Sequence, residues 1–453
     1  MRARRIMLRL NCWLGACLLA LSSTVVAGAD NLDLLFCDTG ETFCAPGELT
    51  AQFISAPVSS DSLAERPLLL GDAGGLRPAL AEYGISANLS TTQYYQGVTS
   101  GGREQTFQYG GRNDYYITMD GGKLGVQEGL IVDLHGESRY GESTYGLVGG
   151  LSPANAGLLF PVPNEDVTAL TQVKVTQFLS EQFIVFGGKI NVVDGYTNTF
   201  AAGKGQTQFM NTAFVLPPIL GRTVPYSSLG AGFAILDGME PIFSMMIMDP
   251  VNHPTTSGFD DLFANGVSIF GEVNVPVNIA NRAGHQQLYF SWSNRDVTAL
   301  EPSAYIDTPI GPLPILPKIS NSWSLLYAFD QYLVVDPCDP KRGWGLFGQF
   351  GLSDGNPNPI RWSATLGVGG SSPLRSRPLD TFGVGYYYFQ LSSELKNTVD
   401  PFIPLANNQG IEAYYNVGVT KWLNITPNLQ VIDPATRANN TAILVGLRTH
   451  LVF

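Results

Sequence analysis

The sequence predicts an all-β fold, a transmembrane antiparallel β-barrel of sixteen strands with a short N-terminal periplasmic helix. Three observations support this prediction. Most of the chain alternates between apolar and polar residues, the connections between the alternating segments switch between short and long, and the N-terminus has the composition of an export signal.

The N-terminus has a basic start, an apolar run from Leu10 to Val26 and the sequence Ala27-Gly28-Ala29. This order is typical of a secretory signal that ends at an A-x-A cleavage site. We therefore expect residues 1–29 to be a signal peptide, residues 30–66 a loosely ordered periplasmic leader and residues 67–453 the β-barrel. Cys37 and Cys44 could form a disulfide in the leader, because an exported chain meets an oxidising compartment.

Composition narrows the class of protein. Only 14% of the residues are charged and the formal net charge is −12. The mean hydropathy is +0.07, and the one long apolar stretch is at the N-terminus, which argues against a helical membrane protein. An exported acidic chain is also a poor partner for nucleic acid, since phosphate binding needs a basic surface.

The predicted elements follow one another from residue 71. Residues 71–84 have the spacing of a short helix that ends at Gly84. Sixteen alternating segments then follow: 85–95, 106–119, 129–139, 167–178, 182–190, 223–235, 241–248, 266–277, 285–293, 321–330, 344–352, 360–369, 381–391, 411–420, 423–431 and 442–453. Most connections after even-numbered strands are short and most after odd-numbered strands are long, as in outer-membrane barrels that begin and end in the periplasm.

The two faces of these segments differ in chemistry. In the segment 129–139 one face carries Leu130, Val132 and Leu134, and the other carries polar and charged side chains. The polar faces along the chain are rich in Gly, Ser, Thr, Asn and Tyr and poor in charge, which favours a confined watery lumen over bulk solvent. The last strand ends on Phe453, and we expect it to face lipid, to pair with the first strand and to be recognised by the barrel-assembly machinery.

Several blocks resemble the OprB family of carbohydrate-selective outer-membrane porins. They include "LLLGDAGGLRPALAEYGI" (68–85), "FQYGGRNDYYITMD" (107–120), "HGESRYGES" (135–143), "GKGQTQFMNTAF" (203–214), "DGNPNPIRWSATLGVGG" (354–370) and the terminal strand. This resemblance extends over residues 68–453. It implies a sixteen-stranded pore in the outer membrane of a Gram-negative bacterium, through which sugars diffuse passively. It also implies an inward-folded loop that narrows the lumen, for which 191–222 is the candidate.

Pleat parity predicts which charged side chains line that lumen. They are Arg112, Asp114, Asp133, His135, Glu137, Arg139, Lys174, Lys189, Arg361, Glu412, Arg448 and His450. Mixed charge suits a neutral polyol, because Arg and carboxylate groups can form paired hydrogen bonds with hydroxyls. The alternative is that these groups hydrate the lumen and brace neighbouring strands as ion pairs.

Other functions remain open at this stage. The pore could instead pass small organic acids, or the barrel could be a non-conducting enzyme or adhesin. No catalytic, metal or cofactor site is expected: the four histidines lack metal-ligand spacing, and Asp133 and Glu137 are about 13 Å apart by strand rise. The expected partners are the lipid bilayer and small carbohydrates. Monomer and homotrimer both remain open.

Overall fold

The computed structural model describes residues 62–309, 311–337, 339–400 and 402–453. The predicted signal peptide, most of the predicted leader and the Cys37–Cys44 pair lie outside the described residues.

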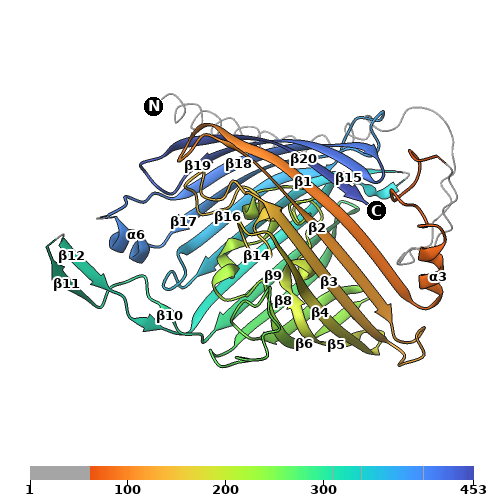
Figure 1. The fold of residues 1–453 in the computed structure, drawn as a ribbon, viewed down its shortest axis with the longest axis horizontal. Coiled ribbons are helices and arrows are strands. Elements are labelled where there is room, and N and C mark those ends of the chain that lie inside the picture. The colour runs from red at the N-terminus through yellow and green to blue at the C-terminus, as the bar shows by residue number, and fades with distance from the viewer. Residues whose placement is uncertain (1–61, 310, 338, 401) are drawn as a thin grey trace.

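Sixteen antiparallel strands form a closed barrel, which confirms the predicted fold class (Figure 1). The strands are β1 (Ile85–Gly102), β2 (Phe107–Asp120), β3 (Leu130–Gly141), β4 (Val167–Ser180), β5 (Phe183–Asn191), β6 (Ser227–Asp237), β7 (Glu240–Met248), β8 (Ser268–Ile279), β9 (Arg282–Ser293), β14 (Ser322–Asp336), β15 (Asp339–Ser353), β16 (Ile360–Ser371), β17 (Thr381–Leu391), β18 (Asn408–Thr420), β19 (Leu423–Asp433) and β20 (Asn440–Val452). Each of them overlaps one predicted segment, and several extend beyond it, such as β1 and β14.

The first and last strands close the barrel by pairing from Ser90 with Val452 to Gly102 with Asn440. The backbone N–H of Phe453 donates to the carbonyl of Leu89 at 3.0 Å. Closure is required here because hydrocarbon offers no hydrogen bonds to an open strand edge. No helix among the described residues is long and apolar enough to cross a membrane.

The short N-terminal helix is α3 (Leu76–Glu82), and it lies beside the seam where the barrel closes. Its Arg77 donates from Nη1 to the carbonyl of Ala87 at 2.8 Å and from Nη2 to the carbonyl of Phe453. The helix is followed by Gly84, whose φ is +78° and where an added Cβ would meet the Cβ of Lys123 at 2.6 Å. Only glycine fits this position, which explains why the helix stops there.

The loop between β5 and β6, residues 192–226, folds into the barrel, as the resemblance implied for residues 191–222. It contains α4 (Val192–Gly195), α5 (Thr212–Val215) and the 3₁₀ helix η3 (Pro218–Arg222). Phe209 and Phe214 of this loop stack with ring centroids 4.5 Å apart. Phe347 of β15 and Tyr387 of β17 pack against them, and all four rings are fully buried. The loop is therefore fixed to the β15–β17 wall by an apolar cluster.

The structure differs from the sequence prediction mainly on the side of the long loops. The predicted loop 294–320 contains β10 (Val297–Thr298), β11 (Ala304–Thr308), β12 (Gly311–Ile315) and β13 (Lys318–Ile319). In Figure 1 the β11–β12 hairpin projects away from the barrel on the side opposite α3. Two short helical segments, η2 (Ala156–Leu158) and α6 (Ser393–Val399), lie in other long loops. Such short elements have too few periodic residues to be detected by alternation.

Candidate functional site

A buried ionic network lies on the inner face of β2 and β3. Arg112 donates from Nε to Oδ2 of Asp114 at 3.1 Å and also forms an ion pair with Glu137. Each of these three side chains is at most 4% exposed. The predicted lumen residues thus meet as a cluster, but the guanidinium and both carboxylates already neutralise one another.

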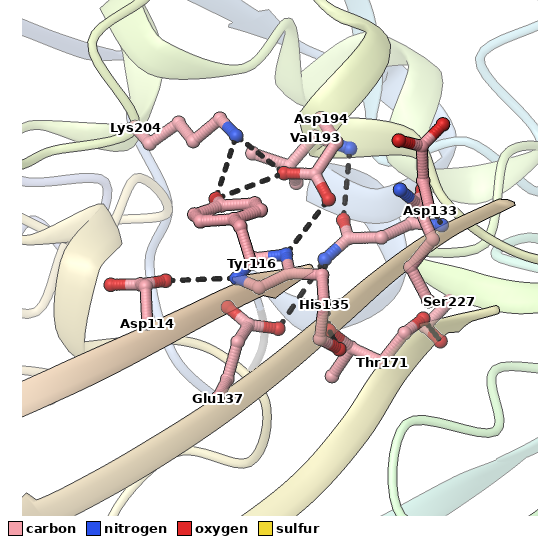
Figure 2. A network of polar contacts seen from close by, with 12 residues as sticks. Asp114, Tyr116, Asp133, His135, Glu137, Thr171, Val193, Asp194, Lys204 and Ser227 are labelled. Carbon is pink, nitrogen blue, oxygen red and sulfur yellow. Dashed lines mark hydrogen bonds and ion pairs between the residues drawn. The ribbon is translucent and has the colours of Figure 1, made fainter. Parts of the chain in front are cut away.

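His135 joins this network to the inward loop (Figure 2). Its Nε2 lies 3.0 Å from Oδ1 of Asp114, and its Nδ1 lies 2.8 Å from Oδ2 of Asp194 in α4. The imidazole also stacks on the ring of Tyr116, with centroids 3.9 Å apart. The imidazole therefore links a carboxylate of the barrel wall to a carboxylate of the loop.

Three side chains of the loop complete the network, and no periodic pattern in the sequence indicated them. Asp194 accepts from His135 and forms an ion pair with Lys204, whose Nζ also donates to the hydroxyl of Tyr116 at 2.9 Å. Gln206 donates from Nε2 to Oδ2 of Asp114 at 2.6 Å. Burial alone would raise the pKa of the Asp194 carboxyl, but the hydrogen bond from His135 and the charge of Lys204 outweigh it and lower that pKa to about 2.

A second anchor holds the middle of the loop, residues 205–211, to β18 and β20. Arg448 donates to the backbone carbonyls of Gly205 at 3.0 Å and Gln208 at 2.7 Å. Glu412 accepts from the backbone N–H groups of Met210 at 2.6 Å and Asn211 at 2.8 Å. Both side chains are fully buried. Two residues predicted to line the lumen therefore position the constriction loop.

The other predicted lumen residues have local roles. Arg139 donates to the carbonyls of Leu158 and Glu165 in the loop after β3. Lys174 lies 3.8 Å from Asp133 on the neighbouring strand. The imidazole of His450 is 2.8 Å from the hydroxyl of Thr92.

Lys189 and Arg361 do not reach the network. The ammonium of Lys189 contacts the carbonyls of Leu170, Pro254 and Thr256, two of which belong to the loop after β7. Arg361 is exposed at a register shift between Ile360 and Trp362, and it donates to the carbonyl of Asp354 in the adjoining loop. Pleat parity misplaced Arg361 because an irregularity at a strand end changes the alternation.

Asp114, His135 and Glu137 have ligand atoms within 4.8 Å of one another, a spacing that could suit a metal ion. Arg112 already forms ion pairs with both of these carboxylates. A metal ion would have to compete with a positive charge that is covalently part of the chain. The arrangement is better suited to bracing the constriction than to holding a metal.

A cavity of about 290 Å³ lies on a different part of the inner wall, between residues 196–202 of the inward loop and β7, β8, β9 and β14. It is lined by Tyr196, Thr197, Asn198, Thr199, Ala202, Glu240, Asn274, His285, Gln287 and Asp330. None of the strand residues in this set was predicted to line the lumen. His285 and Gln287 alternate on one face of β9, so polar parity could have found them, whereas the loop residues have no periodic signal.

Comparison with known proteins identifies the family of this chain. Residues 104–453 match the model of the family described as "Carbohydrate-selective porin, OprB family". The chain belongs to the OprB family. Membership places it in the outer membrane of a Gram-negative bacterium and, together with the barrel, indicates a channel rather than an enzyme.

One curated relative is Porin B of Pseudomonas aeruginosa, 29% identical over 132 residues. The match covers 25% of this chain and spans 29% of the length of that relative. Among solved structures, the high-pH form of Pseudomonas putida OprB superposes with a TM-score of 0.75 at 18% identity, over 87% of this chain and 100% of that one. Its low-pH form gives a TM-score of 0.53 at 16% identity, over 86% and 99%. These likenesses support the fold.

Proposed function

We propose that this chain is a passive diffusion porin for small carbohydrates. The observation that carries the proposal is a sixteen-stranded barrel narrowed by an inward loop, beside which remains a cavity lined by hydroxyl, amide and carboxylate groups. Side chains of this kind can exchange hydrogen bonds with sugar hydroxyls in place of water. The match to the OprB family supports the same substrate class.

The predicted lumen charges have a defined part in this proposal. Arg112, Asp114, His135 and Glu137 shape the constriction by holding the loop from β2 and β3, and Arg448 and Glu412 hold it from β20 and β18. They set the width of the pore more than they contact the solute, because their charged atoms are already paired. Arg139, Lys174, Asp133 and His450 maintain the inner wall.

The test is the single-channel current of the refolded mature protein in a planar bilayer, titrated with glucose and then with a small carboxylate. We expect an open channel that glucose blocks in a saturable way. Block by the carboxylate alone would favour an organic-acid porin, which the carboxylates lining the cavity argue against. A folded barrel without conductance would contradict both pore functions and favour an enzyme or adhesin.

The segments outside the barrel belong to the same proposal. Residues 1–29 direct export and are removed, and residues 30–66 form a periplasmic leader. The terminal strand ending at Phe453 is the segment that the barrel-assembly machinery recognises. N-terminal sequencing of the protein purified from the outer membrane tests the first point, since mature chains should begin at Asp30.

We also propose that the barrel forms a homo-oligomer, a trimer in the simplest case. The outward-facing positions of β20, β1, β2 and β3 include Thr449, Thr91, Gln93, Asn113 and Ser138, which the strand registers place side by side. The side-chain amide of Asn113 makes no hydrogen bond to any other described residue. The outward positions of β7 and β8, by contrast, are apolar, as at Phe243, Ile247 and Val273.

Polar groups facing hydrocarbon are costly, so this wall is better placed against protein than against lipid. A second copy of the chain suits it, because rotation about the membrane normal brings these residues together at equal depth. Replacing Cys37, Cys44 and Cys338 with Ser and adding Thr91→Cys should give disulfide-linked oligomers in native outer membranes. Val273→Cys in the same background is the matched control and should not cross-link; equal cross-linking of both would contradict the interface.

A further inference from the structure

The cavity between the inward loop and the β7–β9 and β14 wall has a hydrogen-bonding pattern that the proposed function does not explain. Asn198 is 8% exposed, Asn274 5% and Gln287 3%, and each has one buried amide atom without a hydrogen-bond partner among the described residues. A buried polar atom left unpaired destabilises the folded protein, because it has lost its hydrogen bonds to water and gained none in return. Three of them around one cavity indicate groups that await a ligand or water.

Two of these amides have an orientation that their neighbours fix. Asn198 accepts through Oδ1 from the backbone N–H groups of Phe200 and Ala201, which leaves its Nδ2 as the unpaired donor. Asn274 donates through Nδ2 to Glu240 at 2.7 Å, which leaves its Oδ1 as an unpaired acceptor. Gln287 contributes another unpaired acceptor through Oε1.

Two carboxylates add negative charge beside these acceptors, although Oδ2 of Asp330 already accepts from the backbone N–H of Thr199 at 3.3 Å. Asp330 is 1% exposed and pairs through Oδ1 with Nδ1 of His285 at 2.8 Å. The side chain of Glu240 is 42% exposed and lies 3.2 Å from Nε2 of the same imidazole. Even with the imidazole protonated, two negative charges face one positive charge. The ten residues lining the cavity include no lysine and no arginine.

The cavity therefore offers more acceptors than donors and an excess of negative charge. A neutral sugar brings hydroxyls that donate and accept equally. An ammonium group brings three donors and no acceptor, and it carries the complementary charge. The volume of about 290 Å³ lies near the lower end of the range for small-molecule pockets, roughly 300–1,000 Å³, which suits a single sugar ring.

We infer that this cavity is a binding subsite for a monosaccharide that carries a protonated amino group, a hexosamine. The ammonium would lie against Glu240 and the unpaired oxygen of Asn274, and ring hydroxyls would meet Asn198 and Gln287. Glu240 and His285 lie just after the β6–β7 and β8–β9 turns, so the subsite is near the periplasmic end of the lumen. The inference rests on the proposed porin function, since the solute must enter the lumen.

The test compares block of the single-channel current by glucose, glucosamine and N-acetylglucosamine at a pH below the pKa of the sugar amine. One charge pair about 5 Å apart in a water-like medium changes affinity about fourfold. We therefore expect glucosamine to half-block the current at a concentration about four- to tenfold lower than the two uncharged sugars. Glu240→Gln should remove this preference, and Asp330→Asn should weaken it.

Glu181→Gln is the matched control, because Glu181 lies in the β4–β5 turn and does not line the cavity. It should leave the preference intact. Equal block by glucose and glucosamine, or a preference that survives both cavity substitutions, would overturn the subsite and leave the porin function standing. If none of the three sugars enters the channel, the porin function itself fails.

Discussion

Arg448 is expected to be the main polar tether of the inward loop. In an Arg448→Met variant the carbonyl of Gln208 loses its side-chain donor, and the carbonyl of Gly205 keeps only the donor Tyr94. The hydroxyl of Thr426 also loses the Arg448 bond, and Oδ1 of Asn416 keeps only the bond from that hydroxyl. Hydrogen bonds from a charged group contribute about 1.5–3 kcal/mol each, and removing one member of a buried polar set typically costs about 3–5 kcal/mol because such contributions are not additive. The equilibrium between docked and released loop should therefore shift by about 10² to 10³-fold or more.

Single-channel recording detects this shift directly. The barrel itself should remain folded, because its backbone hydrogen bonds are untouched, whereas the open current should become larger and noisier as the loop leaves the lumen. Arg361→Met is the matched control, since Arg361 lies against Asp354 and Gly355 and its hydrogen bond goes to the carbonyl of Asp354, outside the inward loop. If Arg448→Met gives the same current and noise as the parent protein, the loop is held by its apolar cluster and the tether argument fails.

Three further outcomes follow from the same geometry. The pKa of Asp194 is lowered to about 2, so its stabilising contribution is present above the ordinary aspartate pKa of about 3.9 and is lost as pH falls through about 2. Acid should therefore raise the current noise of the parent channel in this pH window. The same acid should change the noise of an Asp194→Asn channel less. Phe214→Ala removes a fully buried ring and should weaken loop docking by about 3–5 kcal/mol, read as protease cleavage within 192–226 that the parent protein resists. Deleting residues 303–317 removes the β11–β12 hairpin, whose strands pair with each other among the described residues, and should leave the conductance unchanged. A changed conductance would mean that the hairpin covers the pore.

The barrel was predictable from sequence because each strand must present one face to lipid and one to water. This requirement repeats in the local sequence, and it fixes strand number, pairing order and closure without any long-range information. The candidate site was only partly predictable. Parity found Arg112, His135 and Arg448, but their partners Asp194 and Gln206 are on a loop whose path depends on tertiary packing and has no period.

Parity also could not tell whether a lumen-facing charge is free or paired. Arg448 and Glu412 looked equivalent to solute ligands by sequence, yet both are occupied by the backbone of the inward loop. Asp330 was not predicted to line the lumen, because it is a single acid among apolar and aromatic residues, yet it lines the cavity. Whether a lumen-facing charge is paired depends on the position of the inward loop. The alternation of residues in the strands carries no information about that position.

The difference between paired and uncompensated charges also predicts the ion selectivity of the channel. On the β2–β3 side Arg112 and the surrounding carboxylates are buried and paired, so they exert little net field on a passing ion. On the β7–β14 side Glu240 and Asp330 face the cavity with only His285 to balance them. A single uncompensated charge about 5 Å from the ion path in a water-like medium is worth about 0.8 kcal/mol, or about fourfold.

The reversal potential under a potassium chloride gradient should therefore show potassium permeating a few times more readily than chloride. Glu240→Gln should bring the permeability ratio close to one, because it removes the more exposed of the two carboxylates, while Glu181→Gln should not change it. The effect should also shrink at high salt, since mobile ions screen a charge in an aqueous pore. A channel that prefers chloride would mean that Arg112 on the β2–β3 side, rather than Glu240 and Asp330, sets the electrostatic field in the pore. It would contradict the argument that the β7–β14 side determines ion selectivity.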